Sequence, residues 1–374
     1  MGIQSFVQLA IVLFWVGLAN AGPNSATTIK VLSTGNFHNC VLLNNGTAKC
    51  WGQGDAGQLG NGNALNSPTP THVNGLSNAT AISAGGYHSC ALLSDRTIKC
   101  WGYNSSGQPG NGNMINQLTP TLVSGISNAT AISAGEFVSC ALLITGEVKC
   151  WGYGGYGQLG SAGNSDANTP VSVGITQANQ IAAGGGHICA KLISGSIQCL
   201  GSGTNGQLGN GAFANSSTAV TVSGLSSVST IIAGEAHNCA LSGSSVKCWG
   251  WNTYGQLGNN STSDSATVVS IAGLSANQIA TGTGGVHTCA TISAGRVKCW
   301  GDNSTGQLGD GTLNNSSVPV LVVSLAHAVN VSAGDNHSCA LLNSGAVKCW
   351  GNNSEGELGN GSTASSLTPV SVIF

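Results

Sequence analysis

Charged side chains are scarce in this sequence. Asp, Glu, Lys and Arg together make up 6% of the residues, against about 25% in an ordinary soluble domain. Coiled coils, long exposed helices and charged disordered tails all need many such residues, so these classes are excluded. The formal net charge of −2 leaves no surplus of Lys and Arg to neutralise phosphates. We therefore expect no nucleic-acid partner.

Hydrophobic runs long enough to span a membrane, roughly 20 residues, are also missing. Residues 9–18 form an apolar run of ten, followed by Ala19-Asn20-Ala21, which is typical of a secretory signal peptide and its cleavage site. We expect residues 1–21 to be this signal and residues 22–374 to be a mature, exported chain, extracellular or periplasmic. No Lys or Arg precedes the run, so an uncleaved anchor is the alternative.

Glycine, in contrast, is abundant, with 57 of 374 residues, and it belongs to a repeat. Fourteen cysteines form seven pairs whose first members lie 49 or 50 residues apart. In this frame a Gly lies three residues before a His, and the His two residues before the first Cys. Trp-Gly follows the second Cys, and Gly-Gln-Leu-Gly comes next, as at residues 57–60. Units of this length with Trp-Gly punctuation are typical of β-propeller blades.

The residues between paired cysteines predict a β-hairpin. In the first unit the loop at residues 44–46 ends in Gly, as a three-residue loop with a G1 bulge requires. Counting outward from this loop sets Cys40 opposite Cys50. In the fifth unit the two cysteines are one residue closer together, but a two-residue turn at Gly243-Ser244 again aligns them. We therefore expect the same cysteine register in all seven units.

The unit count predicts the fold class, an all-β, seven-bladed propeller in a single domain. The mature chain has 374 − 21 = 353 residues, which is about seven units of 50. It begins with a strand-like segment at residues 29–33 and ends with another at residues 368–373. We expect these two terminal strands to share one blade and so to close the ring.

The cysteines favour an oxidised framework, because the chain is expected to be exported and has no Cys-x-x-Cys spacing for zinc or thioredoxin-like chemistry. Opposed residues of antiparallel strands are close enough to bond after a small adjustment. Reduced cysteines acting as small core hydrophobes are the alternative. The expected disulfides are Cys40–Cys50, Cys90–Cys100, Cys140–Cys150, Cys189–Cys199, Cys239–Cys248, Cys289–Cys299 and Cys339–Cys349.

The other repeated side chains are expected to build the blades. Six units carry the His, and Val138 replaces it in the third; six carry the Trp, and Leu200 replaces it in the fourth. Imidazoles from six blades cannot all approach one ion to about 2.1 Å, so we expect structural histidines and no metal or other cofactor. No nucleophile elbow, catalytic triad or phosphate loop stands apart from the repeat, so we expect no enzyme activity.

The frame His-x-Cys-Ala-Leu … Gly-x-Val-x-Cys-Trp-Gly … Gly-Gln-Leu-Gly, seen in residues 337–359 with Glu357 in place of the Gln, resembles the repeat of the regulator of chromosome condensation family. The resemblance covers all seven units and implies the propeller fold. It does not choose a function, because this scaffold hosts unrelated roles. Members include a nuclear exchange factor for a small GTPase and a secreted β-lactamase inhibitory protein, and the expected export makes the secreted kind the nearer comparison.

Positions that differ among the units are the candidates for specificity. The residue before the His is aromatic only in the first three units, and the second residue after the Trp is aromatic in three units. Aromatic loop residues are typical of interfaces, although rings that fill the seams between blades are the alternative. Glu136, Glu235 and Asp335 each lie two residues before the His position of their unit and are expected to form an acidic rim. The candidate partner-binding residues are Phe37, Tyr87, Phe137, Tyr103, Tyr153 and Trp251.

These observations predict a secreted, monomeric, non-enzymatic propeller that binds a protein or other macromolecule through loops on one face. Inhibition of an enzyme is one form that such binding could take. The alternative is a guanine-nucleotide exchange factor for a small GTPase, as in the nuclear relative. Export and the uniform unit length, which leaves no insertion to act at a nucleotide site, argue against that alternative. A structural envelope component is a third possibility.

Overall fold

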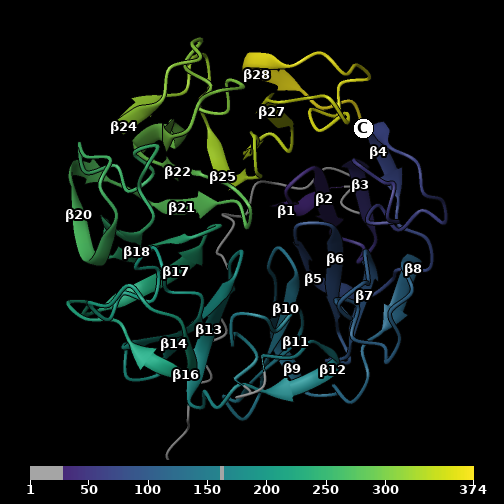
Figure 1. Ribbon diagram of the computed structural model, residues 1–374. Coiled ribbons are helices and arrows are strands. Elements are labelled where there is room, and N and C mark those ends of the chain that lie inside the picture. The colour runs from purple at the N-terminus through teal and green to yellow at the C-terminus, as the bar shows by residue number, and fades with distance from the viewer. Residues whose placement is uncertain (1–27, 161–163) are drawn as a thin grey trace, which may run out of the picture.

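The structure is a computed structural model that describes residues 28–160 and 164–374. Within these residues, 28 strands form seven four-stranded sheets arranged as a ring (Figure 1). The predicted all-β, seven-bladed propeller is therefore confirmed. The predicted signal peptide lies outside the described residues. No helix in the described ranges is both long and apolar enough to span a membrane.

Each blade is an antiparallel meander of four consecutive strands, paired in chain order. Blade 1 contains β1 (Ile29–Thr34), β2 (His38–Leu43), β3 (Ala48–Gly52) and β4 (Ser67–His72). Blade 2 contains β5 (Ala79–Ala84), β6 (His88–Leu93), β7 (Ile98–Gly102) and β8 (Gln117–Leu122). Blade 3 contains β9 (Ala129–Ala134), β10 (Val138–Leu143), β11 (Val148–Gly152) and β12 (Ala167–Ser172). Blades 4 and 5 contain β13 (Ala178–Ala183), β14 (His187–Leu192), β15 (Ile197–Gly201), β16 (Ser216–Thr221); β17 (Val228–Ala233), β18 (His237–Ser242), β19 (Ser245–Gly250), β20 (Ser265–Ser275). Blades 6 and 7 contain β21 (Gln278–Thr281), β22 (His287–Thr291), the 3-10 turn η2 (Ser293–Gly295), β23 (Val297–Gly301), β24 (Ser316–Leu321); β25 (Ala328–Ala333), β26 (His337–Leu342), β27 (Val347–Gly351), β28 (Ser366–Ser371).

The hairpin between the second and third strands has the predicted register. Cys40 pairs with Cys50, and Gly46 takes the positive φ of +79° that the three-residue loop requires. In blade 5, Gly243 has a φ of +60° in a two-residue turn, and Cys239 still pairs with Cys248. The change of turn type has therefore absorbed the missing residue.

All seven cysteine pairs are disulfides in the predicted pattern. The sulfur–sulfur distances are 2.08 to 2.13 Å, and no cysteine of the described residues is left free. Every cysteine is buried, with at most 2% of its surface exposed. Each bridge therefore lies in the interior of the ring and joins the second and third strands of one blade.

The hydrophobic core lies in the seams between blades. The first strand of each blade lies near the ring axis and the fourth at the rim (Figure 1). One buried cluster joins Leu42 and Leu59 of blade 1 to Ile82 and Trp101 of blade 2. Each of the other six clusters likewise combines residues of two adjacent blades. A single blade thus cannot bury its own apolar faces, and the ring is the unit of stability.

The prediction that the terminal strands share a blade is wrong. The last strand, β28, pairs with β27 in blade 7, and the first strand, β1, pairs with β2 in blade 1. The physical reason is that the fourth strand of each unit pairs back across a long loop, residues 53–66 in blade 1, with the third strand of its own unit. Every blade is therefore complete within one unit.

The ring closes through a non-covalent seam between blades 7 and 1. Nε2 of His337 lies 3.0 Å from Oδ1 of Asn39, and Nε1–H of Trp51 donates to the carbonyl oxygen of Glu357 over 2.9 Å. The ring of Phe374, the last residue, packs edge-on against Trp51 with the centroids 5.8 Å apart.

Candidate binding face

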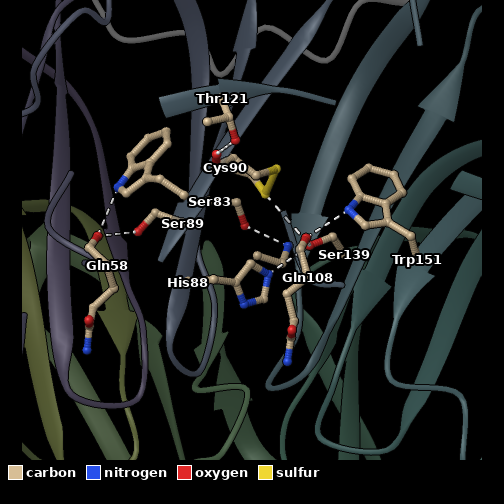
Figure 2. Close-up of a disulfide and its surroundings, with 12 residues drawn as sticks. Gln58, Ser83, His88, Ser89, Cys90, Gln108, Thr121, Ser139 and Trp151 are labelled. Atoms are coloured by element: carbon tan, nitrogen blue, oxygen red, sulfur yellow. Dashed lines mark hydrogen bonds between the residues drawn. A yellow bond between two sulfur atoms is a disulfide. The ribbon is translucent and has the colours of Figure 1, made fainter. Parts of the chain in front are cut away.

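The repeated His, Trp and Gln residues hold the blades together. Figure 2 shows the contact between blades 2 and 3, where Nε2 of His88 lies 2.7 Å from Oγ of Ser139. Ser139 Oγ–H and Trp151 Nε1–H both donate to the carbonyl oxygen of Gln108, over 2.9 and 2.8 Å. The same three bonds recur at six of the seven seams. The repeated residues therefore have a structural role.

The seam between blades 3 and 4 is apolar instead. Val138 stands in place of the His, Ile188 in place of its hydroxyl or amide partner, and Leu200 in place of the Trp. All three belong to one buried cluster and are at most 2% exposed. Both halves of the hydrogen-bonded pair have thus been exchanged together, which avoids leaving one polar group buried without a partner.

The candidate partner-binding residues lie in two sets of loops at one end of the ring. In a meander, the connection from the first to the second strand and the connection from the third to the fourth strand leave the sheet at the same end. Backbone bonds join the two: Gln53 N–H donates to the Phe37 carbonyl over 2.8 Å, and Tyr103 N–H to the Tyr87 carbonyl over 2.9 Å.

Four of the six predicted aromatic residues form one cluster, which we call the aromatic cluster. The ring of Tyr87 lies 5.6 Å from Phe37, 5.6 Å from Phe137 in a stacked arrangement, and 6.1 Å from Tyr103. Tyr103 also packs edge-on against Phe137, 6.5 Å away. All four side chains are half-buried. Blades 1, 2 and 3 therefore share a continuous, partly exposed aromatic surface.

The remaining two candidates make separate contacts. Tyr153 packs edge-on against Tyr156 at 5.6 Å, and it lines a hollow of about 510 Å³ together with Tyr103 and Phe137. Trp251 of blade 5 packs edge-on against Tyr254 at 5.5 Å, and its Nε1–H donates to Thr253. The hollow thus links Tyr153 to the aromatic cluster, whereas Trp251 belongs to a second pair of rings.

The aromatic residues after the Trp leave a buried hydrogen-bond donor without an acceptor. In three of the four units where this position is polar, its side chain bonds the Gln or Glu five residues later; for example, Gln207 Nε2–H donates to Ser202 Oγ over 3.0 Å, and Asn352 Nδ2–H to Glu357 Oε1 over 3.1 Å. In the first unit Gln58 donates to Asp55 instead. Where it is aromatic, the Gln amide nitrogen is buried and unbonded. These glutamines are Gln108, Gln158 and Gln256. The aromatic rings at Tyr103, Tyr153 and Trp251 provide no acceptor for these amides, and a buried donor without a partner is unfavourable, which argues that the rings serve another purpose.

Replacing one of these rings by a polar side chain tests that argument. We expect Tyr153→Asn to leave the free energy of unfolding unchanged or to raise it by up to about 1 kcal/mol, because an acceptor for Gln158 offsets the lost ring burial. Chemical denaturation measures the change. The matched change Ser202→Ala removes the acceptor of Gln207 and should cost about 1 kcal/mol. A loss above about 2 kcal/mol for Tyr153→Asn would show that the ring belongs to the core.

Acidic residues concentrate at this same end of the ring. We call it the acidic face; it comprises residues 35–37 and 53–66 of blade 1 and their equivalents in the other blades. It carries ten of the twelve carboxylates and none of the ten Lys and Arg residues. The ten are Asp55, Glu136, Asp166, Glu235, Asp264, Asp302, Asp310, Asp335, Glu355 and Glu357. This segregation was not predicted, although the positions of the charged residues within the repeat already show it.

Glu136, Glu235 and Asp335 lie in loops between the first and second strands of their blades, at the positions predicted to form an acidic rim. Burial, and secondarily the nearby Glu235 carboxylate, raises the pKa of Glu136 to about 7, and the same two causes raise the pKa of Asp335 to about 7. Burial also raises the pKa of Glu235. The pKa of the Tyr87 phenol is raised by burial and then by the Glu136 and Asp335 carboxylates. The rim and the aromatic cluster therefore share one electrostatic environment.

The described residues contain no group of three or more His, Cys, Asp or Glu side chains with the geometry to hold a metal ion. The six seam histidines are each engaged between two blades, so their side chains do not converge on one point. The arrangement of this face is suited to contact with a partner surface.

Comparison with known families matches this chain to two related descriptions. A model of the RCC1-like domain matches residues 116–373. Models of the regulator of chromosome condensation (RCC1) repeat match residues 29–58, 79–108 and 45–92.

Three solved structures that resemble this chain are each distant from it in sequence. Prp20p of Saccharomyces cerevisiae is 21% identical, with 94% of this chain and 88% of that one covered and a TM-score of 0.76. Human WBSCR16 is 22% identical, with 84% and 86% covered and a TM-score of 0.75. The ectodomain of the receptor kinase CR4 from Physcomitrella patens is 19% identical, with 87% and 73% covered and a TM-score of 0.55. At these identities the likeness shows the fold alone.

Proposed function

This chain belongs to the RCC1-like domain family, and we propose that it is a secreted, non-catalytic binding protein that recognises a partner protein through the aromatic cluster on its acidic face. The observation that carries the proposal is the contact of four half-buried rings from three neighbouring blades, at positions where the repeat does not require aromatic residues. Clustered aromatic side chains with part of their surface free are typical of interface hot spots.

Secretion is supported by the disulfides. Seven buried bridges are stable in an oxidising compartment, whereas the reducing cytosol keeps such thiols free. The predicted signal peptide leads to the same compartment. A propeller of this architecture also occurs outside the cell in the CR4 receptor kinase, where it is part of an ectodomain. Inhibition of an enzyme is one outcome that binding through such a face would have if the partner's active site were covered.

Removing the aromatic cluster tests the proposal. We expect the variant Phe37→Ser, Tyr87→Ser, Phe137→Ser to lose at least about tenfold in affinity for the partner, because each hot-spot ring contributes about 2 kcal/mol or more. The partner is first captured on the immobilised mature chain from the medium of the producing organism and identified by mass spectrometry. Its affinity for each variant is then measured by calorimetry.

The matched control lies on the opposite end of the ring. Ile144 and Ile193 are 46% and 71% exposed in the hairpin loops there, so Ile144→Ser, Ile193→Ser removes exposed apolar surface away from the acidic face. This control should bind like the unaltered protein. Equal affinity of the aromatic variant and the unaltered protein would contradict the proposal, and unfolding of the aromatic variant would show that the rings are core. A small GTPase whose nucleotide exchange this chain accelerates would instead support the alternative function.

A further inference from the structure

The hollow beside the aromatic cluster has walls of two chemical kinds. Tyr103, Phe137, Tyr153 and Tyr156 supply aromatic rings from blades 2 and 3. Glu136 of blade 3 and Glu235 of blade 5 supply two carboxylates. The remaining wall is formed by hydroxyl side chains of blade 2, by glycines and hydroxyl and amide side chains of blade 4, and by Ala236 of blade 5. The volume of about 510 Å³ is ample for one long side chain of a partner.

The two carboxylates in this hollow have no cationic neighbour. No Lys, Arg or His lines it. The pKa of Glu136 is raised by burial and by two other carboxylates, and that of Glu235 by burial, with no basic group acting in the opposite direction. The chain supplies no cation from elsewhere, because all its Lys and Arg residues lie in strands or in the hairpin loops of the opposite end.

We propose that this hollow, which we call the cation pocket, binds an arginine side chain presented by a basic segment of the partner protein. The inference rests on the proposed function and names the chemistry of the partner. A guanidinium stacks on aromatic faces and forms paired hydrogen bonds with carboxylates, so it uses both kinds of wall at once. A lysine ammonium is a compact point charge without a planar surface to stack or a paired set of donors, so it matches the two kinds of wall less well.

The surface around the cation pocket favours a basic partner segment over an isolated small cation. Asp335 belongs to the same rim as Glu136 and Glu235, and its carboxyl is affected electrostatically by Glu235. Seven further carboxylates lie in the outer loops of the acidic face. A segment with several positive charges is therefore attracted along its length, while one side chain enters the pocket.

Ionisation of Glu136 couples this binding to pH. With a pKa of about 7, the Glu136 carboxyl is mostly protonated at pH 6 and mostly ionised at pH 8. A cation binds the ionised form, so affinity should rise about tenfold between these pH values, and binding near pH 7 should release a proton.

Labelled nonapeptides of alternating Arg and Gly, or of alternating Lys and Gly, are suitable probes for the mature protein. Fluorescence anisotropy at pH 8 and low salt gives their affinities. We expect the arginine peptide to bind more tightly than the lysine peptide. The variant Glu136→Gln, Glu235→Gln should lose at least tenfold in affinity for the arginine peptide. The control Asp95→Asn, Glu147→Gln makes the same change of charge on the opposite end and should stay within twofold of the unaltered protein.

Three results would overturn the inference. The first is the absence of arginine-peptide binding at pH 8. The second is an equal loss of affinity in the two charge variants, which would indicate general electrostatic attraction without a pocket. The third is equal affinity for the arginine and lysine peptides. The proposed function is tested separately. If the aromatic variant loses the captured partner while Glu136→Gln, Glu235→Gln retains it, the cation pocket is wrong and the binding face stands. If both variants retain the partner, both proposals fail.

Discussion

Once unfolded and reduced, the chain is expected not to refold. Each disulfide closes a hairpin loop of about eleven residues, and in the chain-entropy model such a loop contributes roughly 2.5 to 3 kcal/mol. These contributions are not strictly additive, but loss of all seven bridges together is expected to remove more than the net free energy of unfolding of about 5 to 15 kcal/mol that is typical of a protein. Refolding from guanidinium with and without dithiothreitol, followed by the fluorescence of the buried tryptophans, measures the effect.

The control for this prediction is the native protein under the same reductant. All fourteen cysteines are at most 2% exposed, so dithiothreitol without denaturant should leave the fold and the bridges intact. A milder test is Cys239→Ala, Cys248→Ala, which should cost about 2 to 5 kcal/mol without unfolding the ring. Recovery of native tryptophan fluorescence by the fully reduced chain would contradict the prediction.

Acidification is expected to destabilise the ring strongly. Burial lowers the pKa of six seam histidines from 6.5 to about 3 or 4, so they stay neutral in the folded state. In the unfolded chain they take up protons below pH 6.5, and stability is therefore lost as the pH falls from 6.5 toward 4. At pH 5 the loss is about 2 kcal/mol for each histidine.

Four carboxyl groups act in the opposite direction. The pKa values of Glu136, Glu235, Asp335 and Glu357 are raised in the folded state, so these groups add stability as the pH falls. Glu136 and Asp335, with pKa values of about 7, contribute about 2 to 3 kcal/mol each at pH 5, against about 12 kcal/mol from six histidines. We expect a net loss of several kcal/mol between pH 8 and pH 5, measured by urea denaturation across that range.

The chain contains its own control for the histidine effect. The variant His88→Val, Ser139→Ile reproduces at the second seam the pair Val138 and Ile188 that the third seam already uses. This variant should lose the uptake of one proton on unfolding, so stability should fall with pH less steeply by about 1.4 kcal/mol per pH unit. Equal slopes in the variant and the unaltered protein, or stability that is the same at pH 7 and pH 5, would rule out the histidines as the cause.

Local features of the fold could be predicted from the sequence, whereas the assignment of strands to blades could not. The cysteine register follows from turn chemistry over about ten residues, and it held even where Gly243 changed the turn type. A period of 50 residues, however, fixes the length of a unit and not where a blade begins. Residues 368–373 correspond to the segment that in other units precedes the first strand of the next unit, and the shared terminal blade was predicted from that order. The equivalent strand β4, however, pairs back across residues 53–66.

The candidate site was predictable in part for a similar reason. The aromatic positions could be found because they break the repeat, and the meander topology then explains why Phe37, Tyr87 and Phe137 lie together. The partner of each seam histidine was missed because it lies one unit further along the chain, 51 residues away in most cases. The simultaneous replacement of that pair by Val138 and Ile188 was the signal available in the sequence. The pocket itself depends on loop conformations from four blades and has no such signal.

The seam between the last and the first blade bears on where the chain could be opened without loss of the contacts between blades. Its His337–Asn39 and Trp51–Glu357 contacts are of the same kind as those at five other joints, and Thr28 and Phe374 line one hollow. The joint between blades 7 and 1 is therefore of the same chemical kind as five of the others. Linking residue 374 to residue 28 and opening the chain at a different joint would give a circular permutant with the same set of contacts between blades, and adding or removing one blade in evolution would require no change in the chemistry of closure.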